Sequence, residues 1–300
     1  MNKNFRYKIE YYLFVMIEKM VHLTPGFLLG PVASGLAVLV FSVIRYRREV
    51  ALENLTYAFP DMSSAERKKI AFGSYRHFAL LILEFMKMSS WDVDDLEKMV
   101  RIEKTPAIDA IVEASQGQGT ILVSGHLGNW EIAIALLASK YFDGVSVIQA
   151  RQRNFILDKY IADMRRRWGI EIIYSRGAVK HALTSISRKR LLGLLPDQDG
   201  GKRGVFVPFL GRMASTQVGA ATLHLRSRSS MIFGGCVRIG QFKYRGFLIP
   251  VNIDSSLKLN RENVQSVTAK FTAELEQLIR QYPEQYLWMH RRWKTPFLGP

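Results

Sequence analysis

The chain has 300 residues, of which 48% are hydrophobic and 23% are charged, as in a folded globular protein and unlike a disordered or collagen-like chain. Lysine and arginine number 42 against 26 acidic residues, a formal charge of +16. Such an excess favours an anionic partner: a membrane surface, a phosphorylated glycolipid, a nucleic acid or an acidic protein. Cys236 is the only cysteine, which excludes an intrachain disulfide, and we expect it to be a buried strand thiol.

A long apolar run without charged residues lies near the N-terminus. Residues 27–44 carry no charge, and Gly30, Pro31 and Gly35 interrupt them, so the run lies at the lower limit for crossing a bilayer. Arginines follow directly at 45, 47 and 48. An apolar surface bordered by cations is typical of an anchor on an anionic leaflet. We predict that residues 1–44 form membrane-associating helices and that 45–300 form a second domain. A pair of ordinary helices packed on the core is the alternative.

The central part of the chain alternates between strand and helix patterns. Ser63 and Glu66 form a capping box before a long helix that extends to about Met88, and a charged connector at 91–104 follows. The pattern then predicts four strands and three helices in turn: strands 120–124, 145–150, 170–174 and 191–195, and helices 131–141, 155–168 and 178–188. Such alternation favours parallel strands joined by right-handed helical crossovers.

The C-terminal part adds different elements. The runs 230–238 and 244–253, with Gly240 between them, predict a hairpin, and an amphipathic helix at 261–280 ends before Pro283. The predicted fold is therefore α/β, with a mixed, mainly parallel sheet flanked by helices. In such a sheet the active groups gather beyond the carboxyl ends of the strands.

One turn places a histidine and a glutamate where chemistry is expected. The sequence SGHLGNWE at 124–131 follows an apolar strand and begins a helix. In a continuous helix, residues five apart would differ by roughly 140° around the axis, but Gly125 and Gly128 permit a bend, so that His126 precedes the helix and Glu131 lies in its first turn. The two side chains can then converge as a general base and its partner. The alternative is a core histidine beside an acid that complements the helix dipole.

Further polar residues follow the ends of other predicted strands. Asp197 and Gln198 come directly after strand 191–195, and we expect both to face the same crevice. Arg151, after strand 145–150, is a weaker candidate for a phosphate contact, with a simple basic surface as the alternative. Asp197 and Asp199 could ligate a cation, but no histidine or further acid stands at ligand spacing. We therefore expect neither a metal nor a cofactor.

Several blocks together resemble the lipid A late acyltransferases, a branch of the glycerolipid-type acyltransferases with a His-x4-Asp/Glu motif. The resemblance covers about residues 45–295, with Leu210 in place of the more usual phenylalanine. The blocks that carry it are RREVALENL at 47–55, SGHLGNWE at 124–131, LPDQD at 195–199, VPFLG at 207–211 and PEQYLWMHRRWK at 283–294.

The resemblance implies an activity and partners. It implies transfer of a fatty acyl chain from acyl carrier protein to a hydroxyl of a phosphorylated glycolipid, a lipid A precursor, at the cytoplasmic face of an inner membrane. His126 would take the hydroxyl proton, and Glu131 would accept a hydrogen bond from the other ring nitrogen, as the acid does in serine hydrolases. No acyl-enzyme is expected, because the chain has no Gly-x-Ser-x-Gly elbow.

The resemblance also assigns roles to individual residues. Arg165, in an Arg-x3-Gly context, is implicated at the site, and Asp197 would bind the acceptor or hold that arginine. Asn129, within the motif, and Gln198 are expected to contact substrate. The negative oxygen of the intermediate would be stabilised by backbone N–H groups near Gly128 or by a guanidinium. Solvated arginines and a polar turn remain the alternatives for Arg165 and Asp197.

Three further expectations complete the prediction. The run at 205–210 could line an acyl groove or belong to the core. The basic, aromatic tail at 288–294 should pack beside the site; its composition also occurs in single-strand nucleic-acid platforms, but no nucleic-acid motif accompanies it, and we expect no nucleic-acid partner. The alternatives to a lipid A acceptor are another membrane glycolipid, such as a phosphatidylinositol mannoside, or a noncatalytic basic module that binds membranes or nucleic acid.

Overall fold

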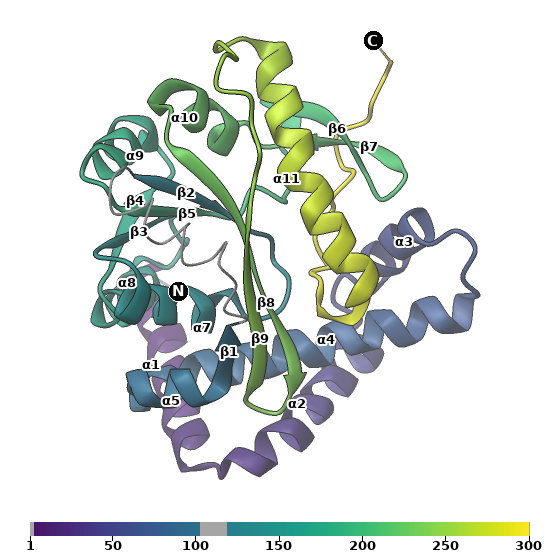
Figure 1. Ribbon diagram of the computed structural model, residues 1–300. Helices are drawn as coiled ribbons and strands as arrows, with labels where there is room; N and C mark the ends of the chain where they lie inside the picture. Colours follow the sequence, from purple (N-terminus) through teal and green to yellow (C-terminus); the bar gives the residue numbers. More distant parts are fainter. Residues whose placement is uncertain (1–2, 103–118, 300) are drawn as a thin grey trace.

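A mixed seven-stranded sheet forms the centre of the computed structural model, which describes residues 3–102 and 119–299 (Figure 1). The strand order is β1-β9-β8-β2-β5-β3-β4. The strands are β1 (Val100–Ile102), β2 (Thr120–Val123), β3 (Val145–Gln149), β4 (Ile170–Tyr174), β5 (Leu191–Leu194), β8 (Ser230–Gly240) and β9 (Lys243–Pro250). The predicted fold class, the four predicted parallel strands and the hairpin are confirmed.

The strands from β8 to β4 run parallel, whereas β9 pairs antiparallel with β8 and parallel with β1. The registers place Val123 of β2 opposite Leu194 of β5. The carboxyl ends of these two strands therefore finish level with each other, and the loops that follow them begin at the same point of the sheet edge.

Helices cover both faces of the sheet. One face packs on α9 (Ala178–Ser187), α10 (Gly219–Ser227) and α11 (Arg261–Gln281), and its core includes Ile121, Leu192 and Phe233. The other face packs on α7 (Trp130–Leu136), through Ile134 and its neighbours. The predicted helix at 131–141 continues beyond α7 as a turn of π-helix, and α8 (Phe155–Arg167) follows β3 as predicted.

The first two helices lie along one edge of the molecule, beneath the long helix α4 in the view of Figure 1. The long predicted helix is α4 (Ser64–Lys87), with the Ser63 and Glu66 capping box formed. Before it come α1 (Lys3–Leu23), α2 (Leu29–Val38) and α3 (Arg48–Ala58). One stretch, Gly26–Val43, is long and apolar enough to cross a membrane by composition. The division at residue 44 stays a prediction.

Two segments differ from the prediction. The connector at 91–104 contains a helix, α5 (Val93–Met99), and the edge strand β1, which is too short to give a periodic pattern; residues 103 and 104 lie outside the described part. The run at 205–210 forms β6 (Val205–Phe209), which pairs with β7 (Arg212–Thr216) in a separate hairpin. Val205, Val207 and Phe209 belong to the core, so of the two alternatives for this run the core is confirmed and the acyl groove is wrong.

Candidate active site

The turn between β2 and α7 carries the histidine. Gly128 has a φ of +63°, and a Cβ at this position would lie 1.9 Å from the carbonyl oxygen of Cys236, so the close approach to β8 requires glycine. The bend places His126 before the helix and Glu131 in its first turn. The local geometry predicted from the two glycines is therefore confirmed.

A buried network of polar side chains around Asn129 supports the turn between β2 and α7. The side-chain oxygen of Asn129 accepts a hydrogen bond from the backbone N–H of Ile132 (3.2 Å) and caps α7. Its amide nitrogen donates to Glu84 on α4 (3.0 Å) and to Tyr244 on β9 (3.3 Å). Glu84 also accepts two hydrogen bonds of 2.6 Å from Arg238 on β8. Asn129 is thus a structural residue, and the substrate contact expected for it is wrong.

Asp197 is the carboxylate bound to the histidine ring. Its Oδ1 lies 2.7 Å from Nδ1 of His126, and its Oδ2 accepts a 2.8 Å hydrogen bond from the backbone N–H of the same residue. The contact follows from the register: His126 and Asp197 each come three residues after the paired positions Val123 and Leu194. The Asp197 side chain is almost fully buried, whereas 20% of the His126 side chain is exposed.

The electrostatics of this pair favour the charged form of each partner. Burial is the largest single influence on His126 and disfavours the imidazolium, but the charge and hydrogen bond of Asp197, with the charge of Glu131, outweigh it and raise the pKa of His126. Burial likewise opposes ionisation of Asp197. The contacts with His126 and the charge of Arg292 outweigh that burial and lower the pKa of Asp197. The carboxylate therefore stays ionised at neutral pH.

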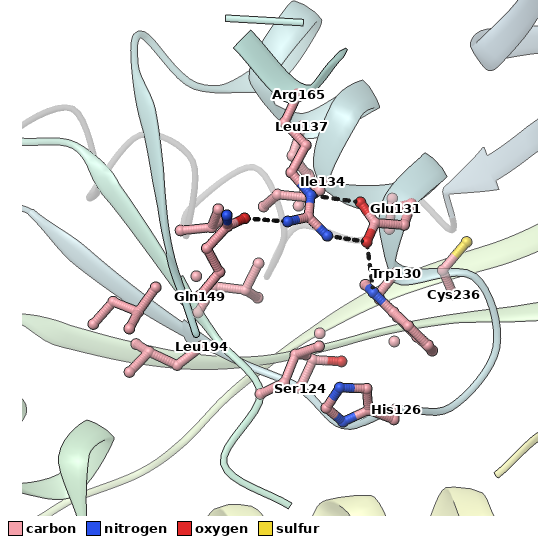
Figure 2. Close-up of a pocket in the computed structure, with 18 of the residues that line it drawn as sticks. Ser124, His126, Trp130, Glu131, Ile134, Leu137, Gln149, Arg165, Leu194 and Cys236 are labelled. Atoms are coloured by element: carbon pink, nitrogen blue, oxygen red, sulfur yellow. Dashed lines mark hydrogen bonds and ion pairs between the residues drawn. The ribbon is translucent and has the colours of Figure 1, made fainter. Parts of the chain in front are cut away.

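Glu131 binds an arginine. Its two carboxylate oxygens accept from Nε of Arg165 (3.0 Å) and from Nη2 of the same guanidinium (2.5 Å), and the indole N–H of Trp130 donates to Oε1 (3.0 Å). Gln149, at the end of β3, accepts from Nη1 of Arg165. Figure 2 shows this chain of contacts above the ring of His126. Bidentate pairing of this kind fixes the plane of a guanidinium.

The partners of Asp197 and Glu131 are therefore the reverse of those expected from the sequence: Asp197 binds the histidine and Glu131 binds the arginine. The hydrogen bond expected between His126 and Glu131 is wrong, because Nδ1 faces Asp197 and the Glu131 oxygens are occupied by Arg165 and Trp130. The suggestion that Asp197 holds Arg165 is wrong for the same reason. The physical cause is that β5 follows β2 in the sheet and delivers Asp197 to the ring directly.

A cavity of about 850 Å³ opens between these two groups of residues. Its wall is mainly apolar and comes from α4, α7 and the sheet, including Leu81, Phe85, Leu122, Ile134, Leu137 and Leu248. The polar side chains that line it include His126, Glu131, Gln149, Arg165 and Gln198. Arg165 is the only arginine or lysine among the lining residues in the described chain. An apolar cavity with a few convergent polar groups is the usual form of a small-molecule site.

Comparison with known proteins shows the family of the chain. The family model described as "Bacterial lipid A biosynthesis acyltransferase" matches residues 1–295. The chain belongs to this family. It is 24% identical over 260 residues to the lipid A biosynthesis palmitoleoyltransferase of Escherichia coli K12, covering 85% of this chain and 81% of that protein. It is also 24% identical over 268 residues to the lauroyltransferase of the same organism, covering 87% and 83%.

A more distant relative has a different acceptor in its name. The phosphatidylinositol mannoside acyltransferase of Mycobacterium tuberculosis is 23% identical over 190 residues, which cover 62% of this chain and 57% of that protein. Membership of the lipid A acyltransferase family confirms the resemblance inferred from the motifs and supports a transferase that acts in lipid A biosynthesis.

The remaining residues predicted for this family member separate into two groups. Gln198 lines the cavity, as expected. Arg151 does not line it: its guanidinium stacks 4.3 Å from the centre of the Tyr174 ring on the exposed surface. The alternative of a basic surface residue therefore fits Arg151 better than a phosphate contact inside the site. Asp199 accepts from Gly201 and Thr295, so its carboxylate has local structural partners.

The C-terminal tail packs beside the site, as predicted. The backbone N–H of Leu287 donates to the carbonyl of His126 (3.1 Å), and the N–H of Gly128 donates to the carbonyl of Gln285 (3.2 Å). Arg292 is buried and donates to the carbonyl of Ser215 (2.5 Å). The tail thus supports the histidine turn from the backbone, and its most buried cation is held by the β6–β7 hairpin.

Sequence reasoning missed Gln149, Trp130 and the network around Glu84. Gln149 could have been found, because it ends a predicted strand in the same way that Asp197 follows one. Trp130 lies inside the motif, but its sequence position gives no reason to expect an N–H contact with the next residue. Glu84 lies within a long helix whose pattern shows only an interior acid, and its partners come from distant strands.

Proposed function

We propose that this chain transfers a fatty acyl chain from acyl carrier protein to a hydroxyl of a lipid A precursor, with His126 as the general base. The observation that carries the proposal is the position of the His126 ring, which is bound by Asp197 at Nδ1 and borders a mainly apolar cavity. The hydrogen bond to Asp197 keeps the proton on Nδ1, so the lone pair of Nε2 can act as the base.

Nε2 of His126 first takes a proton and then returns it. The acceptor hydroxyl gives its proton to Nε2 while its oxygen forms a bond to the thioester carbonyl carbon. The tetrahedral intermediate then breaks its C–S bond, and the imidazolium returns the proton to the leaving thiolate. The acyl chain moves in one displacement, and Asp197 stabilises the imidazolium between the two proton transfers.

Arg165 is the group that stabilises the negative oxygen of the intermediate. The backbone N–H groups of residues 126–129 are engaged with Asp197 and with the carbonyls of Gly125, Gln285 and Cys236, so they are not directed at the cavity. Arg165 has five N–H donors, and three of them bond to Glu131 and Gln149. The two others remain for substrate. Glu131 acts through Arg165 and adds its charge near His126.

An acyl-enzyme on the single thiol does not fit these surroundings. Cys236 borders the cavity but is 2% exposed, and burial raises its pKa to about 12. A thiol with this pKa is almost entirely protonated at neutral pH, whereas the thiolate is the nucleophile. Direct attack by the acceptor hydroxyl therefore remains the route that the lining residues support.

The charge of the chain suits the proposed partners. A formal charge of +16 favours both an acidic carrier protein and a phosphorylated glycolipid at an anionic inner-membrane surface, with the donor on the cytoplasmic side.

The test is acyl transfer by the purified full chain, with an acyl carrier thioester and a lipid A precursor in mixed micelles. Mass spectrometry should show the precursor gaining one acyl chain. His126→Ala should lower the rate by about 10³- to 10⁴-fold. The matched control is His181→Ala, which removes an exposed histidine on α9 and should leave the rate unchanged.

Other results of this experiment would favour a different function. Acylation of a phosphatidylinositol mannoside in place of the lipid A precursor would change the acceptor and keep the chemistry. Polynucleotide binding with a steep salt dependence, without product from any thioester, would support the noncatalytic module instead. An equal loss of rate in the two histidine variants would refute the role of His126.

A further inference from the structure

The first helix presents apolar side chains to both of its sides. Tyr7, Glu18 and Val21 are buried against α4 and α8, whereas Met16 on the opposite side exposes 52% of its surface and Ile9, Leu13 and Met20 are exposed with it. At 3.6 residues per turn these four lie on one stripe. The apolar stripe of a surface helix normally faces the core, so the outer stripe of α1, opposite its buried side, is an apolar surface that no part of the described chain covers.

The second helix repeats this arrangement. Leu29, Ala33 and Ala37 are buried in contact with α4. The other side of α2 is apolar and exposed, and so is the π-helical turn that follows it (Leu39–Val43), where Val43 exposes 69% of its surface. Between His22 and Arg45 the sequence contains no charged residue. The helices α1 and α2 lie along one edge of the molecule (Figure 1). Their exposed apolar sides are together called the apolar edge below.

Both ends of α2 are tied to the rest of the fold. Near its start, the side-chain amide of Gln241 in the β8–β9 turn donates to the carbonyl of Gly26 (2.5 Å). In its middle, Nε of Arg76 on α4 donates to the hydroxyl of Ser34 (2.9 Å). Just beyond its end, the Tyr75 hydroxyl donates to the carbonyl of Tyr46 (2.5 Å). The two ends cannot lie on opposite sides of a bilayer unless α4 and the β8–β9 turn enter the hydrocarbon as well.

Charged residues border the apolar edge in the pattern that anionic lipid headgroups require. Lys8 and Lys19 are exposed and fall on one side of α1, next to its apolar stripe. Arg45 and Arg47 are exposed directly after α2. Apolar side chains inserted at the level of the acyl chains, with cations at the headgroups, are the recognised form of an interfacial helix.

The cavity also opens next to this edge. Ile82 of α4 lines the cavity and still exposes 51% of its surface, and Ile161 of α8 lines it from the other side. α1 packs on both of these helices: the rings of Tyr7 and Phe155 lie 6.0 Å apart, and Asn154 donates to the carbonyl of Tyr7 (3.0 Å). The two helices that line the cavity here, α4 and α8, are thus also the helices on which α1 packs.

We infer that the apolar edge inserts into one leaflet of an anionic bilayer and that neither α1 nor α2 crosses it. A lipid then reaches the cavity sideways from that leaflet, past Ile82. The inference concerns how the protein lies on the membrane and does not depend on which acyl group is transferred.

Cysteine labelling in sealed membrane vesicles tests the topology. The full chain is expressed in bacteria as three single variants, Lys19→Cys, Glu49→Cys and Val179→Cys, whose positions are exposed. The native Cys236 is buried, so the wild type is the blank. Sealed inverted inner-membrane vesicles are treated with a membrane-impermeant maleimide. All three positions should label from the same side; a difference between positions 19 and 49 until detergent is added would show that α2 spans and overturn the inference.

Vesicle binding tests whether anionic lipid covers the apolar edge. The purified double variant Leu13→Glu, Val43→Glu should bind phosphatidylglycerol vesicles at least tenfold more weakly than the wild type. The matched control, Val179→Glu with Leu259→Glu, places two charges on exposed apolar positions elsewhere and should bind as the wild type does. Equal binding by the two double variants would contradict the inference. So would a lipid-free dimer that the first double variant dissociates, because a second copy of the chain would then cover the edge.

Discussion

The two buried carboxylates on either side of the cavity have the same charge and different tasks. Asp197 binds the imidazole at Nδ1 and the backbone N–H of the same residue, whereas Glu131 binds the guanidinium of Arg165. A carboxylate on a neutral imidazole sets its tautomer and stabilises its cation. A carboxylate on a permanently charged guanidinium holds it in place without changing its protonation. The motif glutamate therefore orients an arginine here, while a residue far along the chain orients the base.

The largest loss of activity is expected from a substitution at Asp197. Asp197→Asn should lower kcat by about 10³-fold, because an amide can donate to Nδ1 and thereby place the imidazole proton on the wrong nitrogen. Steady-state acyl transfer measures the effect. Asp143→Asn, at an exposed aspartate, is the control and should leave kcat unchanged. A loss of less than tenfold at Asp197 would show that the ring does not need this carboxylate.

A smaller loss is expected on the other side of the cavity. Arg165→Lys keeps the charge but loses the planar fork that bonds to Glu131, and we expect kcat to fall by about 10²-fold, as when one oxyanion donor is removed. Arg188→Lys on the exposed end of α9 is the control. If Arg165→Lys raised KM for the acceptor and left kcat unchanged, Arg165 would bind the ground-state substrate and not the intermediate.

Glu84 is a buried carboxylate that does not border the cavity. Glu84→Gln would leave the Arg238 cation buried without its counter-charge, and breaking such a pair lowers the free energy of unfolding by about 3–5 kcal/mol. Urea denaturation measures this change. Below the unfolding transition, kcat should fall less than in the Asp197 and Arg165 variants, since Asn129 keeps its cap on α7. A kcat loss as large as that of Asp197→Asn would place Glu84 in the chemistry.

Local sequence signals predicted much of the fold. The strand and helix alternation, the capping box at Ser63 and the bend at Gly128 depend on neighbouring residues, and each is present in the structure. The partner of His126 depends instead on strand order. Only the placement of β5 beside β2 brings position 197 level with position 126, and the sequence predicted parallel strands without their order.

The missed contacts have the same cause. Glu84, Arg238 and Tyr244 come from a helix and two strands that are distant in sequence, so no local period reports their contact. The short strand β1 has three residues, which is too few to show alternation. By contrast, Asp197 and Gln198 could be assigned to the correct edge of the sheet, because every parallel strand leaves its following loop at the carboxyl end.

The contact between His126 and Asp197 should determine how activity and stability depend on pH. The pKa of His126 is raised above its ordinary value of 6.5, so the base is protonated and inactive below that raised pKa, and kcat/KM should increase as the pH rises through it. For stability the sign is opposite: the His126 contribution is complete below the ordinary pKa and is lost as the pH rises through the raised one. Asp197, whose pKa is lowered, contributes above its ordinary value of 3.8 and loses its contribution in acid.

The most direct measurement is the NMR titration of the His126 ring in the wild type, in Asp197→Asn and in Glu131→Gln. We expect a wild-type pKa above 6.5, a large fall of this pKa in Asp197→Asn and a smaller fall in Glu131→Gln, because Asp197 supplies both a charge and a hydrogen bond and Glu131 only a charge. A pKa that stays the same in Asp197→Asn and falls in Glu131→Gln would contradict the assignment of Asp197 as the partner of the base.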